Sequence, residues 1–577
     1  MKVNFKKRLL LALLVVLVLA IAVILINKKT HLDLLSLRLS NTLEKADSEP
    51  LLAVFTFDSL NQNKLLKSSH HYKLKLSRSK KINFDKNLIN NWKKDNNPLV
   101  ITVETWGINP VNSYNENEMI PMVSGKYDIA IKQLCQDLIG KRQNVYIRFN
   151  PEVEVPYKIY PWQGYLHDYT NAFGHLKRLC NKYAPQVKLL WGPSGYPGVL
   201  EYYPGDDLVD AASIILKSNS EINLDVYPKN YSLEYDLIRR VHRLRFINKP
   251  IFVFGSNHSS NDSINQNLIN SVTNHIASNR LIAYSRENFK RPKPQQTTGF
   301  QRKFEIGLYD PNDLLNDNKE VTVEHLFADF SNIHDGYFKK SFDKVIERGH
   351  DVIVTLEPFR NRDQTEDLQV LQNVIAGKYD LELSLFYDII LNTNRKVYLR
   401  YAHEMEIPIT RYLWQSQDPV DYIKSFRYFM DFKSPLPANI KRVWGPAGDR
   451  GSIEWYPGND YVDFISIAIY GLPDKNITDP NKQESFKTIF DRKFWRFRFI
   501  DKPIFITEFG VKGPEEYQTK WLEDAAKVLR QHPEVIGVNY FNMTDTPKAW
   551  GNIKPPDWSI SKNSFDHFVT TLNQEIQ

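Results

Sequence analysis

The chain has 577 residues, of which 42% are hydrophobic and 25% charged, with 24 Gly and 31 Pro. Because a single hydrophobic core stops growing near roughly 250–300 residues, this length predicts at least two domains, and the composition excludes a disordered or collagen-like chain. The formal charge is +8, but residues 1–29 hold six basic and no acidic residues and leave only +2 for the rest, so we expect no nucleic-acid partner.

An apolar segment opens the chain. Residues 9–26 are eighteen consecutive apolar residues, which as a helix would span about 27 Å against a hydrocarbon core of about 30 Å. No small-residue cleavage site follows, which favours an uncleaved signal anchor. More basic residues precede the segment than follow it, so we expect a cytosolic tail at residues 1–8, a polar stalk at 27–50 and a single-pass protein of the cell inner membrane, with its bulk on the periplasmic or extracytoplasmic side.

The rest of the sequence contains an internal duplication. Residues 191–210 align without a gap with residues 444–463, at an offset of 253. At nearly the same offset residues 145–156 match 397–408. A period near 250 residues indicates a duplicated domain rather than a solenoid.

Short apolar runs in each copy alternate with amphipathic segments, as strands alternate with helices. In the first copy we expect strands at 51–57, 72–77, 98–104, 144–150, 187–193, 208–216, 249–255 and 280–286. In the second copy we expect them at 304–310, 325–331, 351–357, 396–402, 440–446, 461–470, 502–508 and 535–541.

Eight strand–helix units in about 250 residues are what a (β/α)₈ barrel requires. We therefore predict an α/β protein with two tandem (β/α)₈ TIM-type barrels after the N-terminal transmembrane helix. The barrels are expected at residues 51–295 and 303–577, joined by a polar, Pro-containing stretch at 290–302. The alternative is a doubly wound open sheet, but no Gly-rich phosphate loop follows a first strand.

Two glutamates end apolar strand candidates in the second copy. Glu404 follows the fourth strand and Glu508 closes the seventh. Because catalytic groups of such barrels come from the carboxyl ends of the strands, the two side chains are expected to meet at the barrel mouth. A neutral carboxylic acid facing a carboxylate is the pair that glycosidic cleavage needs.

Residues 397–510 carry several motifs in a fixed order: Arg400-x-x-His403-Glu404-Met405, Trp444-Gly-Pro, Tyr456-Pro-Gly-x-Asp-x-Val-Asp, Tyr470, and Lys502-Pro followed by Glu508-Phe-Gly. Together they resemble glycoside hydrolase family 26, which contains β-mannanases and related β-glycanases. The resemblance implies a retaining (β/α)₈ enzyme without metal or cofactor. One departure is Glu406-Ile-Pro, where the family commonly has Asn or Asp and then Gly after the Met.

The resemblance also implies roles for individual residues. Glu404 would be the general acid/base and Glu508 the nucleophile. Arg400 and His403 would position the two carboxyl groups, and Tyr470 would hydrogen-bond the nucleophile. Trp414 and Trp550, on the loops after the fourth and eighth strand candidates, would stack on sugar rings.

The first copy lacks part of this set. Gly255 stands in the place of Glu508, and Pro151 in that of His403, while Arg148 and Glu152 match Arg400 and Glu404. Without a nucleophile the first copy is predicted to be inert, either a glycan-binding domain or a folded spacer. Cys135 and Cys180 could form a disulfide, although two buried thiols are the commoner outcome.

The sequence thus predicts a membrane-anchored, retaining β-glycan hydrolase, endo-β-mannanase-like, acting on a cell-surface or exported polysaccharide. Its expected partners are a polysaccharide or oligosaccharide substrate and the membrane. The alternative is a catalytically silent carbohydrate-binding or polysaccharide-assembly scaffold. Loss of Glu508 separates the two, since only a hydrolase would stop releasing reducing ends.

Overall fold

The computed structural model describes residues 41–574, with gaps at 42, 59–63, 66–68, 79–81, 83–85, 95–96, 108–115, 141–144, 217–231, 256–261, 290–303, 316, 361–366, 409–410, 473–483 and 547–553. Within these ranges no helix has the length and apolar character needed to cross a membrane. The predicted cytosolic tail, the membrane segment at 9–26 and most of the stalk lie outside the described residues, so the anchor stays a prediction.

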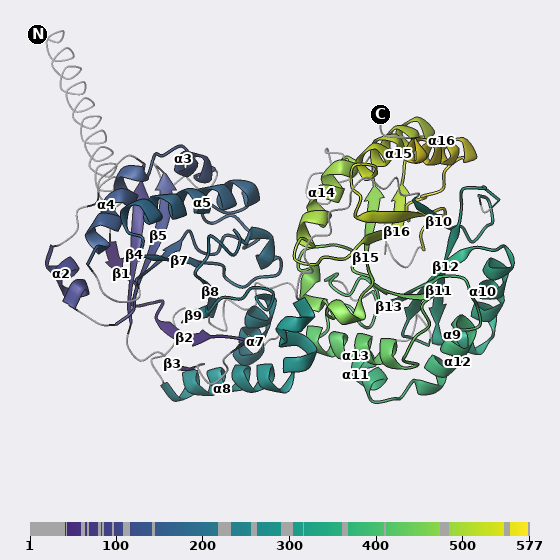
Figure 1. Cartoon of the computed structure of the whole chain (residues 1–577), viewed down its shortest axis with the longest axis horizontal. Coiled ribbons are helices and arrows are strands. Elements are labelled where there is room, and N and C mark those ends of the chain that lie inside the picture. Colours follow the sequence, from purple (N-terminus) through teal and green to yellow (C-terminus); the bar gives the residue numbers. More distant parts are fainter. Residues whose placement is uncertain are drawn as a thin grey trace, which may run out of the picture. The chain divides into compact units, whose positions relative to one another are not determined.

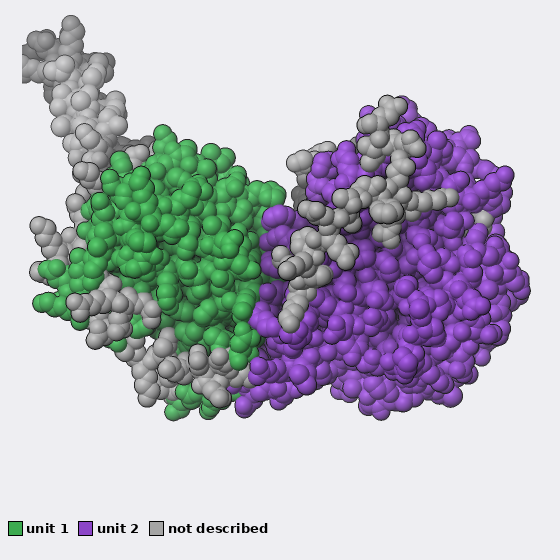
Figure 2. All heavy atoms as spheres, viewed as in Figure 1, with its two compact units in different colours: residues 1–220, 239–241, 247–270 green, residues 221–238, 242–246, 271–577 purple. Residues whose placement is uncertain are grey.

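Two compact units divide the chain, coloured separately in Figure 2. Unit 1 comprises residues 1–220, 239–241 and 247–270, and unit 2 comprises residues 221–238, 242–246 and 271–577. The units interleave in sequence, whereas the sequence predicts a single cut at 290–302. Side-chain contacts explain part of this grouping, because Arg245 donates a hydrogen bond to the Tyr456 carbonyl at 2.9 Å within unit 2.

Unit 2 contains a closed barrel of eight parallel strands, each hydrogen-bonded to the next along the chain and the last to the first. The strands are β10 (Glu305–Tyr309), β11 (Val323–Asp329), β12 (Asp351–Glu357), β13 (Val397–Tyr401), β14 (Ile440–Trp444), β15 (Phe464–Gly471), β16 (Ile504–Val511) and β17 (Val535–Phe541). All eight predicted strands of the second copy are confirmed. The predicted barrel of that copy is therefore correct.

Helices surround this ring of strands (Figure 1). They are α9 (Phe330–His334), α10 (Tyr337–Glu347), α11 (Val370–Ile375), α12 (Asp380–Ile390), α13 (Pro419–Asp431), η6 (Ser452–Trp455), η7 (Asn459–Tyr461), α14 (Phe486–Arg496), α15 (Glu515–Leu529) and α16 (Lys562–Asn573). Helix α13 illustrates the local signals: Asp418 caps its amides at 2.8 and 3.1 Å, and Pro419 takes the first helical turn, where it needs no N–H partner.

The barrel interior is layered because side chains alternate in direction along each strand. One layer is apolar and takes a residue from each of seven strands: Val323, Ile353, Tyr398, Val443, Phe464, Phe505 and Ile536. Two residues further along several of these strands the side chains are polar, as with Thr355 after Ile353 and Arg400 after Tyr398. The apolar layer therefore supports a buried polar layer towards the carboxyl ends of the strands.

Unit 1 is built on an open nine-stranded sheet, in the order β1-β4-β5-β6-β7-β8-β9-β2-β3. Its strands are β1 (Leu43–Lys45), β2 (Leu51–Phe55), β3 (Lys64–Leu65), β4 (His70–Ser77), β5 (Leu99–Gly107), β6 (Val145–Phe149), β7 (Lys188–Trp191), β8 (Ala211–Leu216) and β9 (Ile251–Gly255). The run from β4 to β9 is parallel, but β1 pairs antiparallel with β4, and β2 pairs antiparallel with β9. The predicted closed barrel at residues 51–295 is therefore wrong.

The eighth strand predicted for the first copy does not form. Residues 280–284 make a π-helical turn, η4 (Arg280–Tyr284). Arg245 donates to the Ala283 carbonyl at 3.0 Å, and His242 Nδ1 lies 3.0 Å from the Tyr284 hydroxyl, so this segment is bound by side chains and not by a neighbouring strand. A short apolar run cannot be told from a helical segment by periodicity alone.

Because the eighth strand is missing, strands β2 and β1 of unit 1 take positions near the sheet edges that differ from those of the closed barrel. By sequence offset β2 corresponds to β10, the first strand of the closed barrel, yet it lies antiparallel beside β9, where the missing eighth strand would pair. Strand β1 comes from the predicted stalk and covers the free edge of β4, with Leu43 opposite Leu74. The last part of the predicted stalk is therefore part of the sheet.

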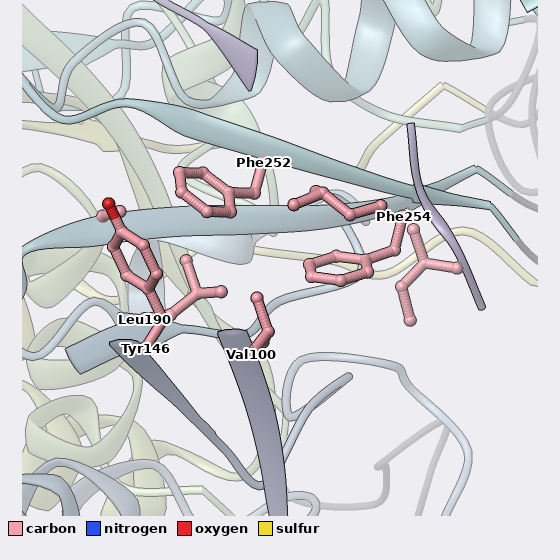
Figure 3. Packing of buried hydrophobic residues seen from close by; sticks show 8 residues of the cluster. Val100, Tyr146, Leu190, Phe252 and Phe254 are labelled. Atoms are coloured by element: carbon pink, nitrogen blue, oxygen red, sulfur yellow. The ribbon is translucent and has the colours of Figure 1, made fainter. Parts of the chain in front are cut away.

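The inner face of this sheet carries an apolar cluster like that of the barrel. Figure 3 shows Val100, Tyr146, Leu190, Phe252 and Phe254 pointing toward one another. Four of these positions correspond to Ile353, Tyr398, Val443 and Phe505 of unit 2 at offsets of 252 or 253. The duplicated sequence thus keeps one core layer although only one copy closes.

The remaining helical segments follow the strands of the first copy. They are α2 (Lys86–Lys94), α3 (Met119–Val123), α4 (Asp128–Leu138), α5 (Leu166–Tyr183), η3 (Val199–Tyr202), α7 (Leu233–Arg243), α8 (Asp262–Ser278) and η5 (Arg286–Phe289). Cys135 on α4 and Cys180 on α5 are buried free thiols with their sulfur atoms 3.6 Å apart. They are in contact and not bonded.

Candidate active site

Arg400, on β13, occupies the polar layer inside the barrel and is 1% exposed. Its Nε donates to Thr355 Oγ1 at 2.7 Å, and its Nη1 donates to Thr507 Oγ1 at 2.9 Å. Its Nη2 donates to Glu508 Oε1 at 2.6 Å. The guanidinium group is thus fixed by strands on either side and aims one N–H at a carboxylate.

Glu508 has hydrogen bonds on both carboxylate oxygens. Arg400 binds Oε1, and the Tyr470 hydroxyl donates to Oε2 at 3.1 Å. Burial and the charge of Glu508 raise the pKa of Tyr470 well above its usual value, so the phenol keeps the proton that it donates. The carboxylate is therefore held in one orientation, beside a cation and a neutral donor.

A strand irregularity lets Glu508 share Arg400 with its neighbour Thr507. Adjacent side chains of a regular strand point to opposite faces. The pairing register of β16 with β17 shifts between Ile506 and Phe509, which is the signature of a bulge. Bulges re-aim side chains at functional sites, and here both Thr507 and Glu508 reach the same guanidinium.

Glu404 lies on a tight turn directly after β13. Its φ is +53°, and that of Ala402 is +44°, so two non-glycine residues adopt left-handed backbone within three positions. Such conformations cost roughly 1–3 kcal/mol each and cluster at functional sites. The Glu404 amide donates to the Gly445 carbonyl at 2.8 Å, and a Cβ at Gly445 would lie 2.5 Å from Arg400 Cδ. The Trp-Gly-Pro motif therefore supplies the glycine that this close approach requires.

The carboxyl group of Glu404 has an environment unlike that of Glu508. Burial, and after it the negative charge of Glu508, raise the pKa of Glu404 to about 8. At neutral pH Glu404 is therefore mostly protonated. The site holds two interacting carboxyl groups, one neutral and able to donate a proton, the other bound by a cation.

His403 is buried at 2% exposure and packs among aromatic rings. Its ring centroid lies 5.2 Å from that of Tyr412, 5.8 Å from Phe327 and 6.1 Å from Trp414. Arg400 and Tyr470 both hydrogen-bond Glu508, whereas the described contacts of the His403 ring are with aromatic rings.

Trp414 does not present a ring to a sugar. It is 0% exposed, stacks on Tyr412 at 4.7 Å and donates from Nε1 to the His403 carbonyl at 2.7 Å. Contrary to the predicted sugar contact, its ring has no free face and supports the turn that carries Glu404. Trp550, the second predicted stacking residue, lies outside the described residues.

Glu406 explains the departure from the family pattern. It is buried, and its Oε1 accepts hydrogen bonds from the Gly448 amide at 2.9 Å, the Asp449 amide at 3.0 Å and Ser452 Oγ at 2.8 Å. The carboxylate therefore ties the loop after β14 to the turn after β13. This is a structural anchor beside the candidate catalytic pair.

Several residues around the site were not predicted from the sequence. They include Thr355, Ser466, Thr507, Tyr412 and Trp558, the last with its ring 4.5 Å from that of Tyr470. Thr355, Ser466 and Thr507 each stand two residues after an inward apolar residue of their strand. That alternation could have identified them, because successive inward positions face the same interior.

No protein-family model matches the chain. A curated β-1,3-xylanase of a Vibrio species is 28% identical over 157 residues, which are 26% of this chain and 30% of that protein. A curated β-1,3-xylanase of an Alcaligenes species is 26% identical over 155 residues, 26% of this chain and 29% of that protein. The chain thus spans less than a third of the length of these relatives.

Solved structures with a similar fold include GH26C from a Muricauda species, at 14% identity and a TM-score of 0.36, over 47% of this chain and 86% of that chain. The catalytic domain of a GH26 endo-β-1,4-mannanase from a Bacillus species matches at 16% identity and a TM-score of 0.33, over 48% of this chain and 88% of that chain. The two curated xylanases confirm the predicted relationship to glycoside hydrolases.

Proposed function

We propose that the barrel of unit 2 is a retaining β-glycan hydrolase of the family 26 type, with Glu404 as general acid/base and Glu508 as nucleophile. One observation carries the proposal: Arg400 and Tyr470 bind the two oxygens of Glu508, while burial beside Glu508 keeps Glu404 protonated. Two carboxyl groups in opposite protonation states are what double displacement requires.

In the first step a Glu508 oxygen attacks the anomeric carbon of the sugar, and the glycosidic C–O bond breaks. The departing oxygen takes the proton of Glu404, which becomes a carboxylate. Arg400 orients the attacking carboxylate from inside the barrel. The product is a glycosyl ester of Glu508 with the configuration inverted once.

In the second step water enters on the face that the leaving group vacated. Glu404, now ionised, removes a proton from this water as its oxygen attacks the anomeric carbon. The ester bond to Glu508 breaks, and the carboxylate returns to Arg400 and Tyr470. Two inversions leave the configuration retained, which requires the carboxyl groups roughly 5–5.5 Å apart.

The experiment that tests the function is a substrate panel read by proton NMR. The two curated relatives are named for β-1,3-xylan and one structural neighbour for β-1,4-mannan, so the panel holds β-1,3-xylan, β-1,4-xylan, β-1,4-mannan and β-1,3-glucan. We expect new reducing ends from at least one polymer, with the β-anomer appearing first. An α-anomer appearing first would contradict the retaining mechanism, and silence on every β-glycan would favour the scaffold alternative.

The pH dependence of hydrolysis gives an independent check on Glu404. Since only its protonated form can act as the acid, kcat/KM should fall about tenfold per pH unit above roughly pH 8, where the raised pKa lies. Below that pH the acid is in place. In Glu404→Gln this basic limb should vanish together with most activity. A wild-type basic limb centred near pH 5 would contradict the assignment, because the carboxyl would then have an ordinary pKa.

A further inference from the structure

Unit 1 keeps much of the machinery that surrounds the candidate site in unit 2. Arg148 Nε donates to Ser213 Oγ at 3.0 Å. His71 Nε2 lies 2.7 Å from Thr102 Oγ1, and in unit 2 His325 Nε2 lies 2.8 Å from Thr355 Oγ1. The polar layer has therefore survived in a sheet that no longer closes into a barrel.

The turn that carries the candidate acid also survives. Asn150 has a φ of +41° and Glu152 a φ of +59°, matching Ala402 and Glu404. The Glu152 amide donates to the Gly192 carbonyl at 2.8 Å, the same distance as between Glu404 and Gly445. Strained backbone persists only where its surroundings over-determine it, so the backbone of unit 1 places Glu152 as that of unit 2 places Glu404.

Because Gly255 replaces the glutamate, the arginine of unit 1 lacks the carboxylate that Arg400 binds in unit 2. In unit 2 the Nη2 of Arg400 binds Glu508, but Arg148 Nη2 is buried and has no hydrogen-bond partner among the described residues. Glu49 approaches from the segment before β2, with Oε2 at 3.5 Å from Arg148 Nη1 and Oε1 at 2.6 Å from Lys73 Nζ. The charge of Arg148 is thus balanced while one N–H stays open to a ligand oxygen.

Aromatic rings beside these groups are accessible to solvent. Tyr160 stacks on Trp162 with centroids 4.7 Å apart and 6° between the planes, as Tyr412 stacks on Trp414 at 4.7 Å and 5°. Trp106 packs edge-on against Tyr160 at 5.8 Å and donates from Nε1 to Glu104 Oε2 at 2.8 Å.

The exposure of these rings differs between the two units. Trp106 and Tyr160 are partly exposed, whereas their counterparts Phe359 and Tyr412 are buried. Unit 1 therefore offers the flat aromatic surface that the corresponding pair in unit 2 does not offer. Pyranose rings pack their C–H faces on such surfaces.

We propose that unit 1 holds a second glycan-binding site that binds without cleaving, with a neutral sugar packed on Trp106 and Tyr160 and one of its hydroxyl oxygens accepting from Arg148 Nη2. The carboxylates of Glu104 and Glu152 accept hydrogen bonds from other sugar hydroxyls. Three carboxylates, counting Glu49, against Arg148 and Lys73 disfavour an acidic sugar. Gly255 removes the nucleophile, so binding there leads to no covalent step.

The carboxylates of the proposed site affect the pKa of Tyr160. Burial, and then the charges of Glu152, Glu104 and Glu49, raise the pKa of Tyr160. Its hydroxyl group therefore stays protonated, under the influence of the same carboxylates that would bind sugar hydroxyls. This inference stands apart from the proposed function of unit 2, because it requires no hydrolysis by the barrel.

Calorimetric titration of the full chain carrying Glu508→Ala tests the proposal. The probes are β-1,3-xylohexaose, β-1,4-xylohexaose and mannohexaose. We expect two sites per chain for the hexaose that binds, and one site after Trp106→Ala is added. Glu152→Gln, an isosteric change, should weaken only the site that Trp106→Ala removes, by about tenfold for one charge-assisted hydrogen bond.

The control is Tyr183→Ala, a partly exposed aromatic at the far end of α5, which should leave both sites unchanged. A stoichiometry that Trp106→Ala leaves unaltered, or an affinity at that site that Glu152→Gln leaves unaltered, would overturn the inference. The inference would also fail if the Glu508→Ala chain cleaved the hexaoses and adding Glu152→Gln abolished that cleavage. If the proposed function of unit 2 fails but unit 1 binds glycan, the chain shows a single site, and Trp106→Ala removes it. This result distinguishes failure of the proposed function from failure of the present inference.

Discussion

Glu508→Ala should lower kcat/KM for β-glycan hydrolysis by at least about 10⁴-fold, the scale seen when one member of a catalytic unit is removed. The change deletes the group proposed to attack the anomeric carbon, and the two groups that bind it, Arg400 and the protonated Tyr470, do not replace its carboxylate. Substrate affinity should change little. Rates are measured as reducing ends released from the polymer identified by the panel.

Azide with an activated aryl β-glycoside makes this prediction specific for a nucleophile. In Glu508→Ala azide should attack the anomeric carbon from the emptied side, the bond to the aryl oxygen breaks, and the phenolate leaves, giving the α-glycosyl azide. The matched variant Glu404→Ala keeps the nucleophile, so azide attacks its ester and gives the β-glycosyl azide. The same anomer from both variants, or wild-type hydrolysis by Glu508→Ala, would exclude the assigned roles.

Arg400→Met should be the most destabilising single change at the site, by about 3–5 kcal/mol, because it leaves the buried carboxylate of Glu508 without its cation. Arg400 is 1% exposed and also binds Thr355 and Thr507. Urea unfolding gives the size of the loss. Hydrogen exchange should locate it in β13 and β16, the strands that the guanidinium joins.

Two further variants separate the ion pair from simple loss of packing. Arg400→Met combined with Glu508→Met should lose less stability than Arg400→Met alone, since a buried pair replaced by apolar side chains leaves no unpaired charge. Arg395→Met removes a 41% exposed arginine from Asp351, and Lys396 keeps its contact with that carboxylate, so the change should cost under about 1 kcal/mol. Equal losses for Arg400→Met and Arg395→Met would refute the buried-pair argument.

The two copies balance their buried arginine in different ways. Loss of the carboxylate at Gly255 would strand a buried arginine, and the structure of unit 1 answers with Glu49, which is 99 residues away from Arg148 in the chain. Phe254 takes the position of Thr507 and lies with its ring 4.7 Å from the Arg148 guanidinium carbon. The charge is compensated, but among the described residues no carboxylate takes the place that Glu508 has in unit 2.

The sequence alone was sufficient for the duplication, the eight strands of the closed barrel and the grouping of Arg400, Tyr470 and Glu508. The duplication and the strands depend on local pattern, because apolar runs of strand length are visible in the order of residues. The grouping of Arg400, Tyr470 and Glu508 came from the resemblance to glycoside hydrolase family 26. The alternation of inward and outward side chains along each strand would also have located the polar layer, although Thr355, Ser466 and Thr507 were not identified from it.

Only the tertiary structure decided the rest. Residues 280–286 have the composition of a strand, but 280–284 form a π-helical turn, whose Ala283 carbonyl accepts from Arg245 and whose Tyr284 hydroxyl contacts His242. Trp414 follows a strand of the barrel and Trp106 lies near the end of a strand of the open sheet, yet the first is buried and the second partly exposed. Burial, counter-ion and strand partner depend on residues distant in sequence, and these contacts exist only once the chain has folded.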